Sequence, residues 1–428
     1  MNSSNFKNYE FDNEVLTCES LIKGFDDEIF NKFELKAKKI NLGKKIKDLF
    51  DGKKVNNSED QAAWHTKYRA ERNQIDSSEK YSELFDSATN IVNIGIGGSF
   101  EGPKLLIESI GSTKFNHLFI TGPDEIEFEE KIKSLKPEDT IFIVSSKSFK
   151  TIETIEIFKI ALMWSGDINK FIAITANKSE ALKYDFKNII EFDKEIGGRY
   201  SIWSDVSLAA QMENNTELKE KFIEGGRQAD QDLIKNDEYF KFLKYLSYSD
   251  IWLNNFKLKN TRVVLSYIWY FRSLPDYIQQ LEMESLGKKS AKDSDFKKTG
   301  QVVFGGYGPR AQHSYFQLLH QGTQELCADI IACSEDKNNL SYAQAFIQSK
   351  LLSKGSSDTL NEEEKINGNV PLNFFLLKKV DPYSLGYLIA SWEHRTFISA
   401  KILEINPFDQ FGVNAGKIYT NKYLADKD

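Results

Sequence analysis

From about residue 90, short apolar runs alternate with longer segments of helical periodicity. The first run, Ile91–Ile96, is followed by a helical pattern that contains Leu105, Leu106 and Ile110. Strands that are apolar along their whole length are typical of parallel sheets, because helical crossovers cover both faces of such a sheet. This alternation predicts an α/β fold with doubly wound, parallel-rich sheets flanked by helices.

The same pattern continues and predicts two domains. The further strands expected in the first unit are His117–Ile120, Thr140–Val144, Lys170–Thr175 and Asn188–Phe192. A second α/β unit is expected beyond residue 225, with candidate strands Arg262–Leu265 and Val302–Phe304 and an aromatic-rich helix, Tyr239–Trp252. The first 60 residues have a mixed pattern for which we expect helices. We therefore predict one domain over 60–225 and a second that combines 1–59 with 226–428.

Charge and cysteine content narrow the class of protein. The chain has 428 residues and a net charge of −7, which argues against nucleic acid as the main partner. Cys18, Cys327 and Cys333 form no disulfide framework, and the last two lack zinc spacing, so reduced thiols and a cytoplasmic location are expected. We see no signal peptide and no apolar run of about 20 residues, and expect no membrane partner.

A glycine pair precedes an arginine at Gly197-Gly198-Arg199. Glycines let the backbone approach a ligand closely, and the guanidinium of Arg199 presents a fixed fork of donors that suits a phosphate or an oxyanion. Taken alone, the stretch is equally compatible with an ordinary turn that carries a solvated arginine.

The segment from Ser145 to Thr151 follows a predicted strand and opens a predicted helix. Free N–H groups at a helix N-terminus attract anions, and the hydroxyls of Ser146, Ser148 and Thr151 can donate to phosphate oxygens. The alternative is a simple N-cap, since Ser and Thr commonly satisfy the first backbone N–H groups of a helix.

Gly95-Ile96-Gly97-Gly98-Ser99 is a second strand-to-helix turn of this kind. It lacks the third glycine of a dinucleotide-binding fingerprint, and no acidic partner for a ribose is evident. A second wall of a phosphate pocket is the simpler interpretation, and a nucleotide site is the alternative.

Three further segments contain candidates for proton transfer or charge stabilisation. Glu284 lies two positions after Glu282 in an amide-rich segment and is a candidate general base, although such a residue is often a surface charge. His313 and His320 are seven residues apart, which is not a compact metal spacing, and each is otherwise compatible with a core histidine. Lys417 follows a glycine and is either a solvated charge or, if buried, a proton donor.

Taken together and in this order, these motifs resemble the glucose-6-phosphate isomerase family. The resemblance rests on Gly95–Ser99, Ser146–Thr154, Gly197–Trp203, Gln279–Lys288, Gln312–Thr323 and Phe408–Lys417. It implies two sugar-isomerase (SIS-type) α/β domains with the active site between them, usually in a homodimer, and a reaction that needs no metal or organic cofactor.

The resemblance also assigns roles to individual residues. Glu284 matches the base that moves a proton between C2 and C1, and Arg199 matches the residue that stabilises the enediolate. His313 matches the ring-opening histidine, which in this family comes from the other subunit, and Lys417 matches the lysine at the ring oxygen. The residues expected to bind the sugar phosphate are Gly98, Ser99, Ser146, Lys147, Ser148, Thr151, Gln280 and Gln410.

The implied function is reversible isomerisation of glucose 6-phosphate and fructose 6-phosphate, in glycolysis and gluconeogenesis. A dual phosphoglucose and phosphomannose isomerase is one alternative, and a non-catalytic sugar-phosphate sensor is another. The sequence departs from the family pattern at Leu286, where an asparagine is usual, at 309–311, and at Asn414, where a glutamate is usual. None of these departures removes a proposed catalytic group.

Overall fold

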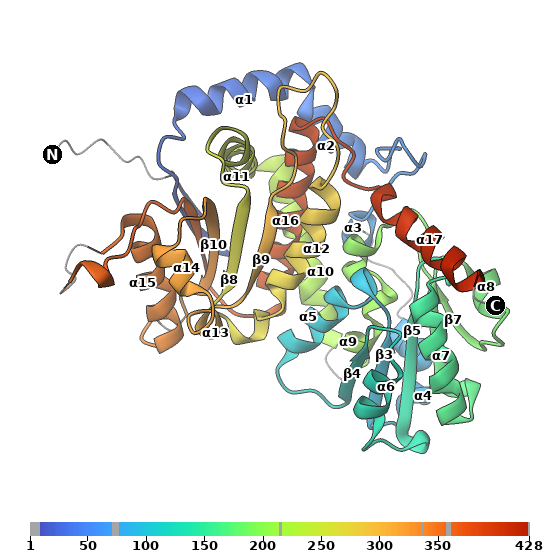
Figure 1. The fold of residues 1–428 in the computed structure, drawn as a ribbon. Coiled ribbons are helices and arrows are strands. Elements are labelled where there is room, and N and C mark those ends of the chain that lie inside the picture. The colour runs from blue at the N-terminus through green and yellow to red at the C-terminus, as the bar shows by residue number, and fades with distance from the viewer. Residues whose placement is uncertain (1–8, 71–76, 214–215, 336, 357–360, 427–428) are drawn as a thin grey trace.

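Two β-sheets, each with its own helices, lie on either side of a group of central helices (Figure 1). The computed structural model describes residues 9–70, 77–213, 216–335, 337–356 and 361–426. The α/β architecture with mainly parallel sheets agrees with the prediction made from the alternating pattern.

The first sheet has five strands, all parallel, in the order β4-β3-β5-β6-β7. Its strands are β3 (Asn90–Ile94), β4 (Asn116–Ile120), β5 (Thr140–Ser145), β6 (Phe171–Thr175) and β7 (Asn188–Glu191). Every residue of β3, β5 and β6 is buried, as expected for strands covered on both faces. The helices of this unit are α4 (Ser77–Phe85), α5 (Glu101–Ile110), α6 (Glu125–Ile132), α7 (Ile152–Ser165) and α8 (Lys178–Leu182).

The second sheet has six strands in the order β1-β2-β11-β10-β8-β9. Its strands are β1 (Tyr9–Asp12), β2 (Leu16–Leu21), β8 (Thr261–Ser266), β9 (Val302–Tyr307), β10 (Leu326–Cys333) and β11 (Leu372–Leu377). The last four are mutually parallel, and β2 runs antiparallel to β11.

The expectation of helices in the first 60 residues is wrong for β1 and β2, and right for α1 (Asp27–Lys39) and α2 (Leu42–Phe50). Strand β2 forms because its inward-facing residues alternate along the chain and because β11 offers an open edge, with Leu16 opposite Leu377. That edge belongs to a segment more than 350 residues away, so local periodicity could not reveal it. Strands β10 and β11 were also absent from the sequence prediction.

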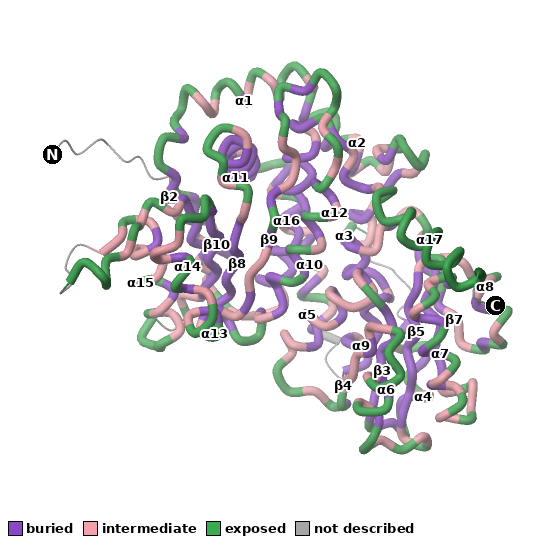
Figure 2. Tube along the Cα trace, viewed as in Figure 1, coloured by how far each residue is buried: buried purple, intermediate pink, exposed green. Residues whose placement is uncertain are grey.

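The central helices pack against one another between the two sheets. They are α10 (Thr216–Lys235), α11 (Asp237–Phe256), α12 (Leu274–Leu286) and α16 (Pro382–Ile402). Figure 2 shows α16 as an almost continuously buried tube. Helices α10 and α16 approach so closely that a Cβ atom added at Gly386 would lie 2.0 Å from the carbonyl oxygen of Phe222. The predicted domain boundary at residue 225 falls inside α10, so the domain division stays a prediction.

The remaining helices lie at the periphery or in connections. They are α3 (Lys67–Ala70), α9 (Leu208–Gln211), α13 (Gly308–Ala311), α14 (Phe316–Gln321), α15 (Leu340–Lys354) and α17 (Asn414–Ala425). None of the helices in the described parts of the chain is both long and apolar enough to cross a membrane.

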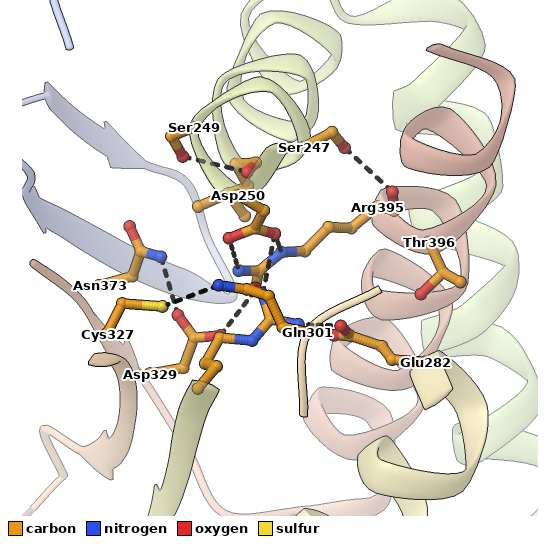
Figure 3. Close-up of polar contacts among 12 residues, drawn as sticks. Ser247, Ser249, Asp250, Glu282, Gln301, Cys327, Asp329, Asn373, Arg395 and Thr396 are labelled. Carbon is orange, nitrogen blue, oxygen red and sulfur yellow. Dashed lines mark hydrogen bonds and ion pairs between the residues drawn. The ribbon is translucent and has the colours of Figure 1, made fainter. Parts of the chain in front are cut away.

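A buried cluster of charged side chains joins α16 to the second sheet (Figure 3). The guanidinium of Arg395 donates to both carboxylate oxygens of Asp250 on α11, at 2.8 and 2.9 Å, and to Asp329 on β10 at 2.9 Å. Asn373 on β11 donates to the other oxygen of Asp329 at 2.7 Å. Arg262 on β8 also pairs with Asp250 at 2.8 Å. Each buried charge therefore has an opposite charge beside it, as burial requires.

Replacement of Arg395 by methionine should destabilise the fold strongly, because Asp250 and Asp329 each lose one of their two buried guanidinium partners and Arg262 alone must then serve both carboxylates. We expect a loss of about 3–5 kcal/mol in the free energy of unfolding, measured by chemical denaturation. Lys32→Met is the control, since its ion pair with Glu28 is exposed and solvent screening leaves it little effect on stability. Equal effects of the two substitutions would contradict the role given to the cluster.

Candidate active site

Arg199 lies at the centre of a polar cluster that joins three distant parts of the chain. Its side chain is 1% exposed. Its Nε donates to Ser285 at 2.8 Å, and its Nη1 donates to the Glu284 carboxylate at 3.0 Å and to the Gln410 side chain at 2.5 Å. The alternative of a solvated arginine is thus wrong, because the side chain is buried and its donors are engaged.

The segment 407–410 completes the shell around the guanidinium. Nη2 of Arg199 donates to the carbonyl oxygens of Pro407 and Asp409, the second at 3.2 Å. The Asp409 carboxylate pairs with Lys288 at 3.1 Å. Burial lowers the pKa of Lys288, and its hydrogen bond to Asp409 opposes that shift.

The 3₁₀ helix η4 (Gly198–Trp203) carries Arg199, and the glycine at its start lets it approach the backbone of the other glycine turn closely. A Cβ atom added at Gly98 would lie 2.0 Å from the carbonyl oxygen of Gly198, so the two glycine turns touch through their backbones. Tyr277 on α12 donates to the carbonyl oxygen of Arg199 at 3.1 Å. Trp203 donates to Glu393 on α16 at 2.7 Å, which fixes the far end of η4.

Helix α12 presents two acids to different environments. Glu284 is 36% exposed, and its second carboxylate oxygen accepts a hydrogen bond from Gln280, one turn earlier, at 3.2 Å. Glu282 is buried, accepts a hydrogen bond from Trp392 at 2.7 Å and contacts Arg262. The spacing of the two acids predicts this difference in direction. Glu284 is therefore the acid that a ligand can reach.

The Ser145–Thr151 loop leads from β5 into α7. Thr151 occupies the N-cap position of α7, yet its side chain makes no capping hydrogen bond and instead lies 3.0 Å from the Ser146 hydroxyl. The simple N-cap interpretation therefore does not describe Thr151. Phe149 has φ of 53°, a left-handed conformation that costs about 1–3 kcal/mol for such a residue. Its wholly buried ring packs edge-on against Phe186 and holds the turn.

Lys147 connects this loop electrostatically to Arg199. Burial is the largest influence on Lys147 and lowers its pKa. The positive charge of Arg199 lowers the same pKa, whereas the negative charge of Glu59 raises it. The loop and the arginine therefore lie close enough for their charges to interact.

The second glycine turn lies between the loop and α12. Gly97 has φ of 59°, a conformation that favours glycine, and a Cβ atom added there would lie 2.9 Å from the amide nitrogen of Gln280. Gly98 and Ser99 follow in the same turn, and a Cβ atom at Gly95 would lie 2.8 Å from that of Ser99. Both turns and α12 thus border one site.

His313 and Lys417 lie outside this cluster in the single chain. His313 is exposed in the turn between α13 and α14, and Lys417 lies on α17, where no residue is buried. Within the described residues, neither side chain has a hydrogen bond or ion pair with Glu284 or Arg199. His320, the second histidine of the motif, is bonded to Gln348 at 2.8 Å and so has a structural partner.

Several residues of the cluster were not singled out from the sequence. They are Tyr277, Ser285, Lys288, Pro407 and Asp409. Four of them lie inside a motif that was recognised from the sequence, or immediately beside one. That position was the sequence signal that could have identified them. No group of three or more His, Cys, Asp or Glu side chains that could hold a metal ion occurs in the residues that the structure describes.

Comparison with known proteins shows the family to which this chain belongs. The family model described as "Phosphoglucose isomerase" matches residues 72–427. The chain belongs to the phosphoglucose isomerase family. Among the most similar members, a glucose-6-phosphate isomerase of Shewanella halifaxensis is 34% identical over 462 residues, covering 92% of this chain and 85% of the relative. One from Baumannia cicadellinicola is 32% identical and covers 100% of this chain and 89% of the relative.

A solved structure of another family member shows the same fold. The glucose-6-phosphate isomerase of Chlamydia trachomatis superimposes with a TM-score of 0.85 at 24% identity. The match covers 98% of this chain and 90% of that one. The arrangement of two mainly parallel sheets is therefore that of the phosphoglucose isomerase fold.

Ser285→Ala should impair the site through Arg199, because Nε of the arginine and the hydroxyl of Tyr200 both lose their buried partner at 285. An unsatisfied buried donor lowers stability by about 1–3 kcal/mol. The less firmly held guanidinium should in addition lower turnover in the isomerisation reaction of the family about tenfold. Ser349→Ala is the matched control, since that buried hydroxyl bonds only within α15. Unchanged turnover in Ser285→Ala would show that Ser285 does not position Arg199.

Proposed function

We propose that this protein interconverts glucose 6-phosphate and fructose 6-phosphate through an open-chain sugar and a cis-enediolate. The observation that carries the proposal is the carboxylate of Glu284 held 3.0 Å from the buried guanidinium of Arg199, beside a phosphate-type loop. Isomerisation of an aldose requires a base at the carbon next to the carbonyl and a positive charge for the oxygen atoms, and this pair supplies both.

In this mechanism Glu284 removes the proton from C2 and returns it to C1. Negative charge develops on the enediolate oxygens during the transfer, and Arg199 is already fixed to receive it. Because the guanidinium is held by Ser285, Gln410 and backbone carbonyls, it needs no reorganisation when the charge forms. Gln280 orients the other carboxylate oxygen of Glu284 and, with Gln410, is placed to contact sugar hydroxyls.

The phosphate group is proposed to bind at the start of α7. The hydroxyls of Ser146, Ser148 and Thr151 and the free N–H groups of the first helical turn would hold it, with Lys147 nearby. Gly98 and Ser99 form the adjacent wall. An anchor away from the reacting carbons orients the sugar and supplies binding energy for that orientation.

Ring opening is proposed to use groups that the single chain leaves exposed. His313 would act in the site of a second copy in a homodimer, which its exposed position between α13 and α14 permits. Lys417 would stabilise the ring oxygen, which requires α17 to pack against the site in the assembled enzyme. Near neutral pH a histidine can accept the proton of the anomeric hydroxyl.

Glu284→Gln should abolish most turnover of fructose 6-phosphate, because the amide cannot accept a proton from C2. The variant should still bind fructose 6-phosphate. Loss of a general base lowers kcat by about 10²–10⁴-fold. Exposed Glu129→Gln is the matched control.

Reactions of the unaltered protein in heavy water, with a chelator present, test the route of the proton. The same assay with mannose 6-phosphate as a second substrate tests the substrate range.

Proton transfer through a carboxylate admits solvent deuterium at C1 or C2, whereas a direct hydride shift admits none. Full activity in Glu284→Gln, or turnover without any deuterium incorporation, would contradict the assignment of Glu284 as base. If fructose 6-phosphate protects the unaltered protein against thermal unfolding but is not converted by it, the protein is a sensor instead.

A mixing experiment tests whether His313 acts across a subunit boundary. Glu284→Gln and His313→Ala are each expected to be inactive, but hybrid dimers would contain one site with both groups intact. When subunits exchange freely, half of the dimers are hybrids with one intact site, so roughly a quarter of the wild-type activity should return. No recovery after demonstrated exchange would place His313 in the site of its own chain.

A further inference from the structure

A cavity of about 620 Å³ lies at the ends of α1, α2 and α16. It is called the second cavity because it is distinct from the proposed substrate site. Its wall also includes parts of the segments 55–58 and 404–406. None of the residues proposed to bind the sugar phosphate lines it. A cavity of roughly 300–1,000 Å³ is of the size that holds a small molecule.

The lining of this cavity is strongly basic, although the chain as a whole has a net charge of −7. Lys39 from α1, Lys45 from α2 and Lys401 from α16 all border it. Within the described part of the chain, none of these three ammonium groups forms an ion pair. Glu404, the acidic residue in the lining, is bonded to Lys36 at 2.9 Å. The positive charge of the cavity is therefore not neutralised by the protein.

Lys401 is the least solvated of the three lysines. Its Nζ lies 4.9 Å from the centre of the Phe397 ring and 5.8 Å from that of Phe408. Burial, followed by the positive charge of Lys45, lowers the pKa of Lys401 to about 8. Buried charges in proteins are ordinarily paired. Lys401 therefore has two aromatic rings beside its ammonium group and a second lysine near it, but no carboxylate among the described residues, which leaves its charge available to an anion.

We propose that this cavity binds a small phosphorylated anion at a site separate from that of the substrate. A doubly charged phosphate group can neutralise several ammonium groups at once and accept hydrogen bonds from each of them. Asn57, whose side chain has no hydrogen-bond partner among the described residues, lines the same cavity and offers a further donor. The size of the cavity leaves room for an organic part beyond the phosphate.

The cavity wall is bonded directly to the segment that holds Arg199. Asn406 donates to the Ser58 hydroxyl at 2.7 Å, and Ser58 donates to the Asp409 carboxylate at 2.6 Å. The carbonyl oxygen of Asp409 in turn accepts a hydrogen bond from Arg199 at 3.2 Å. An anion that moves Asn406 or Ser58 therefore moves the shell of the arginine. We expect binding of the anion to change turnover. This kinetic effect rests on the proposed function, whereas binding of the anion does not.

Binding is tested without turnover, using inorganic pyrophosphate as the probe and isothermal titration calorimetry as the measurement. The unaltered protein should show two classes of site. Ser148→Ala combined with Thr151→Ala should weaken one class, and Lys401→Met should weaken the other by about tenfold. Lys45→Gln alters an exposed position of the same cavity and tests the site even if Lys401→Met does not fold.

Exposed Lys32→Met is the control and should leave both classes unchanged. A single class that neither cavity variant affects would overturn the proposed site. Because this measurement needs no isomerisation, its failure is distinct from a failure of the proposed function.

The kinetic consequence is tested with fructose 6-phosphate as substrate. Pyrophosphate bound only at the phosphate loop competes with the substrate and raises the apparent KM. Pyrophosphate bound in the second cavity should in addition change kcat, by about twofold or more. The change in kcat should disappear in Lys45→Gln and Lys401→Met, while competition remains. Purely competitive inhibition in the unaltered protein would overturn the coupling to Arg199.

Discussion

Helix α16 carries opposite charges into the interior, and each meets its partner in a different half of the molecule. Arg395 pairs with Asp250 and Asp329 of the second half at 2.8–2.9 Å. Glu393 accepts hydrogen bonds from Arg69 at 2.5 Å and from Trp203 at 2.7 Å. Because an unpaired buried charge is costly, these contacts tolerate little relative movement of the two halves. Arg199 lies in the same 3₁₀ helix as Trp203, and Glu284 lies on α12, so the distance between them depends on this constraint.

The roles of the two acids on α12 follow from what surrounds them. Glu282 is enclosed by Arg262 and Trp392, which makes it an anchor for the helix. Glu284 remains partly exposed and faces the guanidinium, which leaves it available to a ligand. The anchor and the proposed base are thus separated by half a helical turn, and the burial of the first fixes the direction of the second.

Net charge is a poor guide to the ligands of this protein. The chain is acidic overall, but Lys147 and Arg199 gather positive charge around the proposed substrate site, and three lysines do so around the second cavity. Local fields in partly desolvated sites outweigh a distant excess of surface carboxylates, because solvent and salt screen the latter. The two regions that we propose to bind anions can therefore coexist in an acidic protein, and the segment 406–410 connects them.

The sequence by itself determined the five strands of the first sheet and the motifs of the family, because continuous apolar runs and turn residues are local properties. It did not reveal β1, β2, β10 and β11. For β2 the reason is physical, since its pairing with β11 joins residues more than 350 positions apart and local periodicity cannot show that edge. Taken alone, the stretch Gly197–Arg199 was equally compatible with a turn that carries a solvated arginine, and the role of Arg199 followed only from the resemblance to the family. Only tertiary structure decided that it is buried and bonded to Ser285, Glu284 and Gln410, because packing brings those distant segments together.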